Sequence, residues 1–582
     1  MFTLFQRYLK KSALVCACCA PFCMLLEVFM DLQQPTMMSN IIDIGIVQND
    51  MSYVLHTGGI MLLCALTGVF GGCGCTVLSS YASVHMGGIL RERLFSKIQG
   101  LSFHEIDQWE TSSLITRLSN DITQVQEMVG QLLRTLSRAP ALCIGSVVMS
   151  VLLSPRLALI FCVILPLLMV SIYVIITKTV PMFALLQKLM DRVNTIMREN
   201  LLGVRVIKAC GLQHIQAEHF EAANINLQKQ SIHAQSATFL LMPIVSLIMN
   251  LSVVAVLWLG GSMEIAGSLQ AGKIMAFVNY MLQITNSLVM LVNFVSSISR
   301  AQASASRILE VMDVKEHMID GTRTSCNPHQ DITFEDVSFH YQEGEDVLHH
   351  ISFTIKQGQR IGIIGGTGSG KSTLVSLLPR IYDVSSGSIR LGQTDIKEFK
   401  MKELRHRIGI VLQDSLLFSG SVWDNITFGN DDASEEQVIE ALQLCSAYDF
   451  LKEKEGVLMH EVEQRGKNFS GGQKQRMSIA RTLLRKPDIL ILDDSTSAVD
   501  LATEAILQKG IRTWMKGKTM IMVAQRISSV MDCDQIMVLD HGHLIAKGTH
   551  EELLVQCELY QSIAITQLGE EVLTYATATH SA

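Results

Sequence analysis

A glycine-rich segment in the second half of the chain has the residue types needed to hold a phosphate. It reads Gly365-Gly366-Thr367-Gly368-Ser369-Gly370-Lys371-Ser372-Thr373 and directly follows an expected strand at Arg360–Gly365. The spacing fits G-x-x-x-x-G-K-[ST] in its strand–loop–helix setting, with the helix expected to start at Leu374. Glycines let backbone N–H groups turn toward a β-phosphate, and the helix N-terminus adds positive potential. We expect Lys371 to reach the β- and γ-phosphates and Ser372 to ligate Mg²⁺.

A second chemical signal is an apolar run that ends in an acid, Ile489-Leu490-Ile491-Leu492-Asp493. Such a run predicts a buried strand, and a carboxylate at its end can hold the coordination shell of Mg²⁺. A phosphate loop and this strand together predict a nucleoside triphosphatase. They do not say which kind.

The elements around these residues predict a mixed α/β domain. Strands are expected at Ile332–Tyr341, Val347–Ile355 and Arg360–Gly365. The first 300 residues differ in composition. The 582-residue chain is 48% hydrophobic and only 17% charged, whereas soluble proteins carry roughly a quarter charged residues. The deficit lies in that first part and indicates a membrane. The net charge of −7 gives no support for nucleic-acid binding.

Six apolar segments are long enough to cross a bilayer, which takes about 20 residues of helix. They are expected near 13–33, 55–80, 130–153, 157–177, 237–261 and 273–298. Two long polar connections, 81–129 and 178–236, contain few helix breakers and should extend these helices into water. The loop 34–54 has no Lys or Arg, whereas the long connections are rich in them. The positive-inside rule therefore places both termini and the long connections in the cytoplasm.

Charged residues stand out inside the expected spans. Glu27 and Asp31 lie one helical turn apart in the first span, and Arg138 lies in the third. A charge at the centre of a membrane helix costs roughly 2.5–3.5 kcal/mol, so it usually faces a cavity or a partner. Two interpretations stay open. The acids line a translocation pathway that binds cations, or they lie near an interface or pair with neighbouring helices.

The segment that precedes the apolar run at Ile489–Asp493 indicates which class of ATPase this is. Asn468-Phe469-Ser470-Gly471-Gly472-Gln473-Lys474-Gln475-Arg476 resembles the signature sequence of ABC transporters, at the place where that family has it. Ser470 can cap a helix whose free N–H groups face an anion. The resemblance implies that this anion is the γ-phosphate of an ATP held by the opposite subunit. Binding residues implied here are Ser470, Gly471, Gly472 and Gln473, and dimerisation is implied for hydrolysis.

Further family landmarks follow in order along nearly the whole chain. Tyr341 matches the aromatic residue that stacks on adenine, and Gln413 matches the Q-loop residue that touches Mg²⁺. Asp500 ends a match to the D-loop, and Glu461–Gly466 resembles a segment that contacts the coupling helices of exporters. The membrane half contains stretches typical of exporter cytoplasmic loops, at 117–121 and 202–208. The implied cofactors are ATP and Mg²⁺, with the metal held by Ser372, Gln413 and Asp493.

The resemblance implies a multi-domain fold: an all-α polytopic membrane domain of six transmembrane helices plus an α/β P-loop NTPase cassette. We expect the membrane domain at 1–310, a linker at 311–330, the nucleotide-binding domain at 331–570 and a tail at 571–582.

The sequence departs from the family pattern at two positions that bear on hydrolysis. Asp494 stands where the family has the Glu that polarises the attacking water, so the side chain is one methylene shorter. Gln525 stands where the family has the His that contacts the γ-phosphate. An amide can donate a hydrogen bond but cannot exchange a proton near neutral pH. Both changes together predict a site that binds ATP and hydrolyses it poorly.

An impaired site beside an intact signature is similar to the degenerate-site subunit of bacterial heterodimeric multidrug exporters. The resemblance implies ATP-driven export of amphipathic or hydrophobic small molecules across the plasma membrane, with a second half-transporter as partner and no nucleic acid. Gln413, Asp494 and Gln525 are then the catalytic positions. Two alternatives stay open: a homodimeric exporter of lipid or peptide, and a non-transporting ATP-gated regulator on the same scaffold.

Overall fold

The computed structural model describes residues 11–315, 317–325, 327, 329–341 and 344–569. The expected tail at 571–582 lies outside the described residues. The chain divides into two compact units. One takes in the chain up to Ile98 together with Thr111–Asp313, and the other combines Gln99–Glu110 with the chain from Val314 onward.

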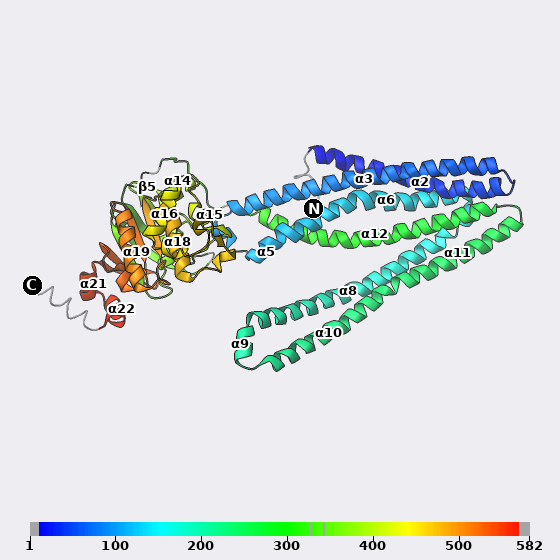
Figure 1. Ribbon diagram of the computed structural model, residues 1–582. Coiled ribbons are helices and arrows are strands. Elements are labelled where there is room, and N and C mark those ends of the chain that lie inside the picture. The colour runs from blue at the N-terminus through cyan, green and yellow to red at the C-terminus, as the bar shows by residue number, and fades with distance from the viewer. Residues whose placement is uncertain (1–10, 316, 326, 328, 342–343, 570–582) are drawn as a thin grey trace, which may run out of the picture. The chain divides into compact units, whose positions relative to one another are not determined.

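Long helices make up the first unit (Figure 1). They are α2 (Lys11–Asn40), α3 (Met51–Gly100), α5 (Thr111–Thr116), α6 (Ile122–Leu153), α7 (Pro155–Ala158), α8 (Phe161–Leu202), α9 (Val204–Ala209), α10 (Gln213–Phe239), α11 (Leu241–Ile265) and α12 (Ala271–Met312). Short π-helical turns at Ile41–Ile46 and Arg117–Asp121 continue α2 and join α5 to α6. Six of the resulting rods are long and apolar enough to cross a membrane.

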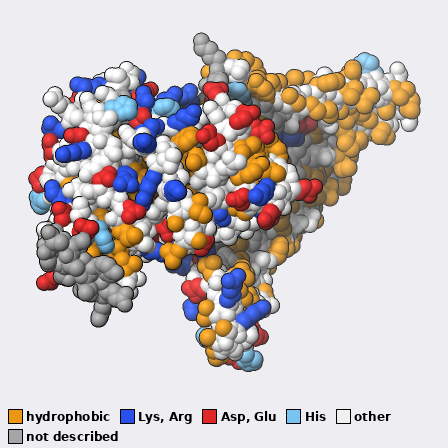
Figure 2. All heavy atoms as spheres, turned by 60° about the vertical axis from the view of Figure 1, so that its left-hand side comes forward, with side chains coloured by type: hydrophobic (Ala, Val, Ile, Leu, Met, Phe, Trp, Pro, Cys, Tyr) orange, Lys and Arg blue, Asp and Glu red, His pale blue; other side chains and the backbone are white. Residues whose placement is uncertain are grey.

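These rods run well beyond the expected apolar spans. The second reaches from Met51 to Gly100, for example, and the fifth from Gln213 to Ile265. The apolar pattern ends where the hydrocarbon layer would end. The polar residues that follow contain few helix breakers, so the helices continue beyond the layer. Within the unit, α6 packs against α12 and α2, and α8 runs beside α10 (Figure 1). Hydrophobic side chains cover much of the outer surface of these helices, as a lipid-facing surface requires (Figure 2).

Three charged residues of the spans, Glu27, Asp31 and Arg138, pair with one another. Arg138 on α6 donates from Nη1 to Glu27 Oε1 at 2.5 Å and from Nη2 to Asp31 Oδ2 at 3.2 Å. Both acids belong to α2, so the ion pairs link two neighbouring helices. The structure shows the pairing between helices, and Glu27 and Arg138 also line a cavity, so the pairing does not exclude the other interpretation.

The second unit contains two larger sheets. The antiparallel sheet has the order β2-β1-β4-β5, and the central one has the order β12-β11-β3-β10-β9-β6. The strands are β1 (Ile332–Phe339), β2 (Leu348–Ile355), β3 (Arg360–Gly365), β4 (Ser386–Leu391), β5 (Thr394–Asp395), β6 (Ile408–Val411), β7 (Gly420–Ser421), β8 (Glu461–Val462), β9 (Ile489–Asp493), β10 (Thr519–Val523), β11 (Gln535–Asp540) and β12 (His543–Gly548). The short strands β7 and β8 pair separately.

Helices of this unit cover the sheets and connect their strands. They are α4 (Phe103–Ile106), α13 (Lys371–Leu377), α14 (Met401–Arg407), α15 (Val422–Thr427), α16 (Glu435–Leu444), α17 (Tyr448–Leu451), α18 (Gly471–Leu484), α19 (Leu501–Trp514), α20 (Ile527–Val530), α21 (His550–Gln556) and α22 (Glu558–Leu568). Two buried apolar clusters fill the space between them and the sheets.

The central sheet brings the chemical residues to one edge. β10 lies between β3 and β9, and all three run parallel. The carboxyl ends of parallel strands meet at the same edge, so the segments that follow Gly365, Asp493 and Val523 are neighbours. This strand order is the reason that residues separated by more than 150 positions form one site.

One expectation about this region was wrong. The helix after the phosphate loop begins at Lys371, three residues before Leu374. Gly370 closes the loop with φ = 92°, a left-handed conformation that glycine adopts without strain. A Cβ there would come within 2.7 Å of the Leu348 side chain. The chain therefore enters the helix at once, and Lys371 and Ser372 belong to its first turn.

Candidate nucleotide-binding site

The glycine-rich loop folds around the ammonium group of Lys371. Lys371 Nζ donates to the carbonyl oxygens of Gly365 at 3.0 Å and Gly366 at 2.6 Å, and to Ser369 Oγ at 3.3 Å. Burial lowers the pKa of Lys371, although the nearby carboxylates of Asp493 and Asp494 oppose this shift. A Cβ at Gly365 would collide with the carbonyl oxygen of Leu539, so the close approach of loop and β11 requires glycine. The loop is a cationic, amide-lined cradle suited to phosphate.

Two oxygen-bearing side chains that could ligate a metal ion, Ser372 and Asp493, lie beside the cradle. The hydroxyl of Ser372 donates to Asp493 Oδ1 at 2.8 Å. Burial at the end of β9 raises the pKa of Asp493, and the neighbouring Asp494 adds to this shift. A hydroxyl and a carboxylate are hard oxygen ligands of the kind that Mg²⁺ accepts, with substrate phosphates completing the shell. The donor set therefore fits Mg²⁺, which would neutralise charge on the β- and γ-phosphates.

The two departures from the family pattern meet in one hydrogen-bonded group. Gln525 Nε2 donates to Asp494 Oδ2 at 2.9 Å, and Gln413 Nε2 donates to the same oxygen at 3.3 Å. Only 9% of Asp494 is exposed. Burial raises the pKa of Asp494, while the bond from Gln413 and the charge of Lys371 partly offset the shift. Asp494 also has φ = 46°, which fixes its backbone in a conformation unusual for a non-glycine residue.

Tyr341 lies at the edge of the cradle. Its hydroxyl and Thr373 Oγ1 are 2.9 Å apart, and 41% of the residue is exposed. Its ring meets the ring of Tyr382 edge to face, with centroids 5.2 Å apart. The contact and the hydrogen bond hold the Tyr341 ring in place beside the cradle.

The signature segment forms the capped helix start that the sequence predicts. The Ser470 hydroxyl accepts from Gln473 N at 3.3 Å, and the Gln473 side chain accepts from Ser470 N at 2.9 Å. In the part of the chain that the structure describes, no hydrogen bond joins this segment to the phosphate loop.

The same helix is joined to the expected D-loop. Gln475 Oε1 accepts from Ala498 N at 3.1 Å. A Cβ at Gly472 would approach the carbonyl oxygen of Ala498 within 2.7 Å. Asp500 ends the D-loop and caps α19 by accepting from Thr503 N at 3.0 Å. Signature and D-loop thus form one packed unit.

With this geometry established, comparison with known proteins decides the family. Family models match residues 17–288 as an ABC transporter transmembrane region and 348–497 as an ABC transporter. The chain is 38% identical over 565 residues to the ABC transporter ATP-binding protein YfiB of Bacillus subtilis, covering 97% of this chain and 98% of that one. It belongs to the ABC exporters.

It is also 31% identical over 515 residues to the ATP-dependent lipid A-core flippase of Yersinia pestis, with 88% of each chain covered. A solved bacterial Atm1-family ABC exporter with ATP bound matches with a TM-score of 0.79 at 25% identity, over 96% of this chain and all of the other.

Membership of the ABC exporter family implies ATP-driven transport. An ABC ATPase cassette fused to a multi-pass helical membrane domain couples ATP hydrolysis to transport, and ABC exporters act as dimers in the membrane. The expected fold, six membrane-spanning helices plus an α/β cassette, is confirmed.

A contact that sequence reasoning missed joins the exporter's first long loop to its cassette. Tyr382 Oη donates to Asp107 Oδ2 at 2.6 Å, and its ring lies 6.1 Å from that of Phe103. Burial raises the pKa of Tyr382, and the Asp107 carboxylate adds to this effect. Nothing near Tyr382 in the sequence points to a partner 275 positions away.

Two further bonds fix the same loop segment. Glu105 is 1% exposed and accepts hydrogen bonds from Ser102 N at 2.8 Å and from His317 N at 3.0 Å. Since Tyr382 also contacts Tyr341, a short chain of side chains connects this segment to the adenine-stacking position.

Proposed function

We propose that this exporter is one half of a heterodimer that exports amphipathic or hydrophobic compounds across the plasma membrane. Its own phosphate loop forms a degenerate ATP site, and its signature completes the competent site of the partner. Its termini and cassette are cytoplasmic. The observation that carries the proposal is the bonding of Asp494 to Gln525 and Gln413.

The chemistry of this group supports slow hydrolysis. Two amide donors already occupy one oxygen of a carboxylate that is one methylene shorter than the Glu of the family. Neither Gln can take up a proton near neutral pH. The phosphate cradle, by contrast, has its glycines, Lys371 and Ser372 in place. Such a site retains ATP binding while losing much of the machinery that activates water.

The intact signature supports a partner of a different sequence. A homodimer would contain two impaired sites and two complete signatures. In a heterodimer, the capped helix at Ser470 would face an ATP held by a chain with Glu and His at the two divergent positions. We expect that partner to carry an altered signature, since it would face the slow site.

Affinity purification of the full-length exporter from its native membranes tests this proposal. A second half-transporter should co-purify in equal amount. The pair should hydrolyse ATP, and the transported compound should increase the rate of this hydrolysis. The chain expressed without the partner should be nearly inactive. Robust, substrate-stimulated hydrolysis by the chain alone would overturn the heterodimer.

That contrary result would favour a second candidate, a homodimeric lipid exporter. The specific observation in its favour is the 31% identity to a lipid A-core flippase over most of both chains. Flipping of a labelled lipid in vesicles that contain this chain alone would establish it.

A further inference from the structure

A cavity of about 610 Å³ opens among α2, α3, α6 and α12 of the membrane unit. Met24, Val69 and Met290 contribute to an apolar wall. Glu27 and Arg134 contribute charged groups to the same cavity. A space of this size, apolar with a few polar groups, is typical of a small-molecule site. The apolar wall suits a hydrocarbon chain, and the charged groups suit a polar head.

The charges of the cavity are only partly used by the protein. Arg138 is committed to Glu27 and Asp31 through its two terminal nitrogens. Glu27 gives one oxygen, Oε1, to this pair. Its other oxygen, Oε2, is buried and has no hydrogen-bond partner among the described residues. A buried acceptor without a partner costs about 1–3 kcal/mol, or more when it is charged.

The position of this carboxylate depends on a glycine of the facing helix. A Cβ at Gly72 on α3 would lie 2.5 Å from Glu27 Oε2. Any side chain there would displace the carboxylate. The adjacent Gly71 allows equally close approach, because its Cβ would lie 2.8 Å from the carbonyl oxygen of Cys23. The two glycines therefore make room for the carboxylate at the helix contact.

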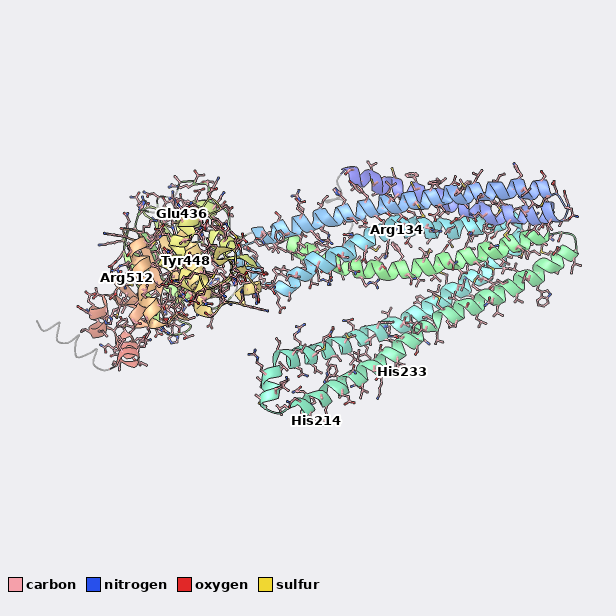
Figure 3. All side chains as sticks on the ribbon, in the orientation of Figure 1. Arg134, His214, His233, Glu436, Tyr448 and Arg512 are labelled. Carbon is pink, nitrogen blue, oxygen red and sulfur yellow. The ribbon has the colours of Figure 1, made fainter. Side chains whose placement is uncertain are left out.

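Arg134 supplies the opposite charge. It lies on α6 (Figure 3), and its sequence position is one helical turn before that of Arg138. Among the residues that the structure describes, it has no hydrogen-bond or ion-pair partner. Since an unpartnered guanidinium in a membrane span is costly, such residues usually face a ligand or a partner. The cavity thus offers one uncommitted anionic oxygen and one uncommitted cation.

From this juxtaposition we infer that the cavity binds a zwitterionic amphiphile, a molecule with an apolar chain and a head that carries both an amine and an anion. The ammonium group donates to Glu27 Oε2, and the anion accepts from the Arg134 guanidinium. Glu27, Asp31, Arg134 and Arg138 sum to zero charge, so a head of zero net charge preserves neutrality inside the membrane. Charge-assisted hydrogen bonds of this kind are about twice as strong as neutral ones.

The inference rests on the proposed export function only in treating the bound amphiphile as cargo. Binding itself can be measured without nucleotide. The purified full-length exporter, with any partner that co-purifies, is held in a neutral maltoside detergent. Native mass spectrometry then gives apparent dissociation constants for three probes with the same tail: dodecylphosphoethanolamine, dodecyl phosphate and dodecylamine.

We expect the zwitterionic probe to bind about tenfold or more tightly than dodecyl phosphate or dodecylamine, whose heads carry charge of one sign only. Arg134→Gln should remove the preference over dodecylamine, because it weakens the zwitterionic and phosphate probes and leaves dodecylamine binding unchanged. Gly72→Ala should weaken the two amine-bearing probes, because it displaces the Glu27 carboxylate. Lys178→Gln, at an exposed position of α8, is the matched control and should change nothing.

Equal binding of the three probes, no binding, or a response of Arg134→Gln equal to that of Lys178→Gln would overturn the inference. Melting temperatures of the variants, measured in parallel, separate a binding defect from misfolding. If the probes bind as expected but the chain proves to be a homodimer or does not transport, the proposed function fails and the site remains. If the heterodimer is active and the probes do not bind, only the site fails.

Discussion

Restoring the family residues at Asp494 and Gln525 should turn the slow site into a working one. Asp494→Glu adds one methylene, which advances the carboxylate by about 1.5 Å. Gln525→His replaces an amide donor, now 2.9 Å from Asp494 Oδ2, by a ring that can exchange a proton. Misplacement by about 1 Å costs on the order of a hundredfold in rate. The double variant should therefore regain about that factor at this site.

The size of the observable change depends on the partner's site. If this site contributes about a hundredth of the turnover of the competent one, restoring it to parity about doubles the ATPase activity of the complex. In a complex whose partner has its own catalytic Glu replaced by Gln, the same change should raise the remaining activity about a hundredfold. The assay is phosphate release by the reconstituted complex at saturating ATP.

Two controls make the result specific. Asp494→Asn in the background with the disabled partner should lower the remaining activity further. Asp431→Glu, the same methylene addition at an exposed loop position, should have no effect. Unchanged activity of the Asp494→Glu, Gln525→His variant in both backgrounds would refute the reasoning, because the slow site would then not be limited by these groups.

Three other contacts give further predictions. Tyr382→Phe removes the hydroxyl that donates to Asp107 and should cost about 1 kcal/mol, because Asp107 is exposed; basal hydrolysis should persist while its stimulation by transported compound falls. Glu105→Gln should lower the melting temperature at pH 7. Burial opposes the lowered pKa of Glu105, but hydrogen bonds outweigh it, so the deficit should shrink as the pH falls below the ordinary value of 4.5. Gly472→Ala should cost about 1–3 kcal/mol through contact with the Ala498 carbonyl and should reduce hydrolysis by the complex.

Each of these has a clear contrary result. Equal stimulation of Tyr382→Phe and wild type would mean that the bond to Asp107 does not transmit motion. A melting deficit of Glu105→Gln that stays constant as the pH falls from 7 to well below 4.5 would mean that its charge is not what stabilises the segment. Gly471→Ala is the control for Gly472→Ala, because its Cβ meets only the Ala498 Cβ at 3.5 Å and should leave the melting temperature unchanged.

Much of the cassette could be predicted because its signals are local. The strand at Ile489–Asp493 coincides with its apolar run, and β3 ends at the first glycine of the phosphate loop. The start of α13 was misplaced because the conformation of Gly370 is set by its packing on Leu348, which no local pattern reveals. The membrane helices were placed correctly, and their expected continuation into the long polar connections is confirmed, because those connections contain few helix breakers.

Long-range partners were beyond sequence reasoning. The charges Glu27 and Arg138 could be found as anomalies in apolar spans, but whether they face one another depends on the rotation of α2 and α6. The cavity that surrounds them depends in turn on Gly72, whose neighbours in sequence are also small. The three-residue group at Asp494 was foreseen only as separate family positions, and its hydrogen bonds follow from the strand order β10-β9-β6.

The bond between Gln475 and Ala498 has a consequence for how two unequal sites share work. Only a few residues separate Asp494 from the D-loop, and a single amide side chain fastens that loop to the signature helix. In the proposed heterodimer, a displacement at the degenerate ATP site on nucleotide binding or release would move the signature glycines, which contact the ATP of the competent site. A subunit that hydrolyses ATP slowly can in this way still control the rate of hydrolysis at the competent site, as a regulator of that site.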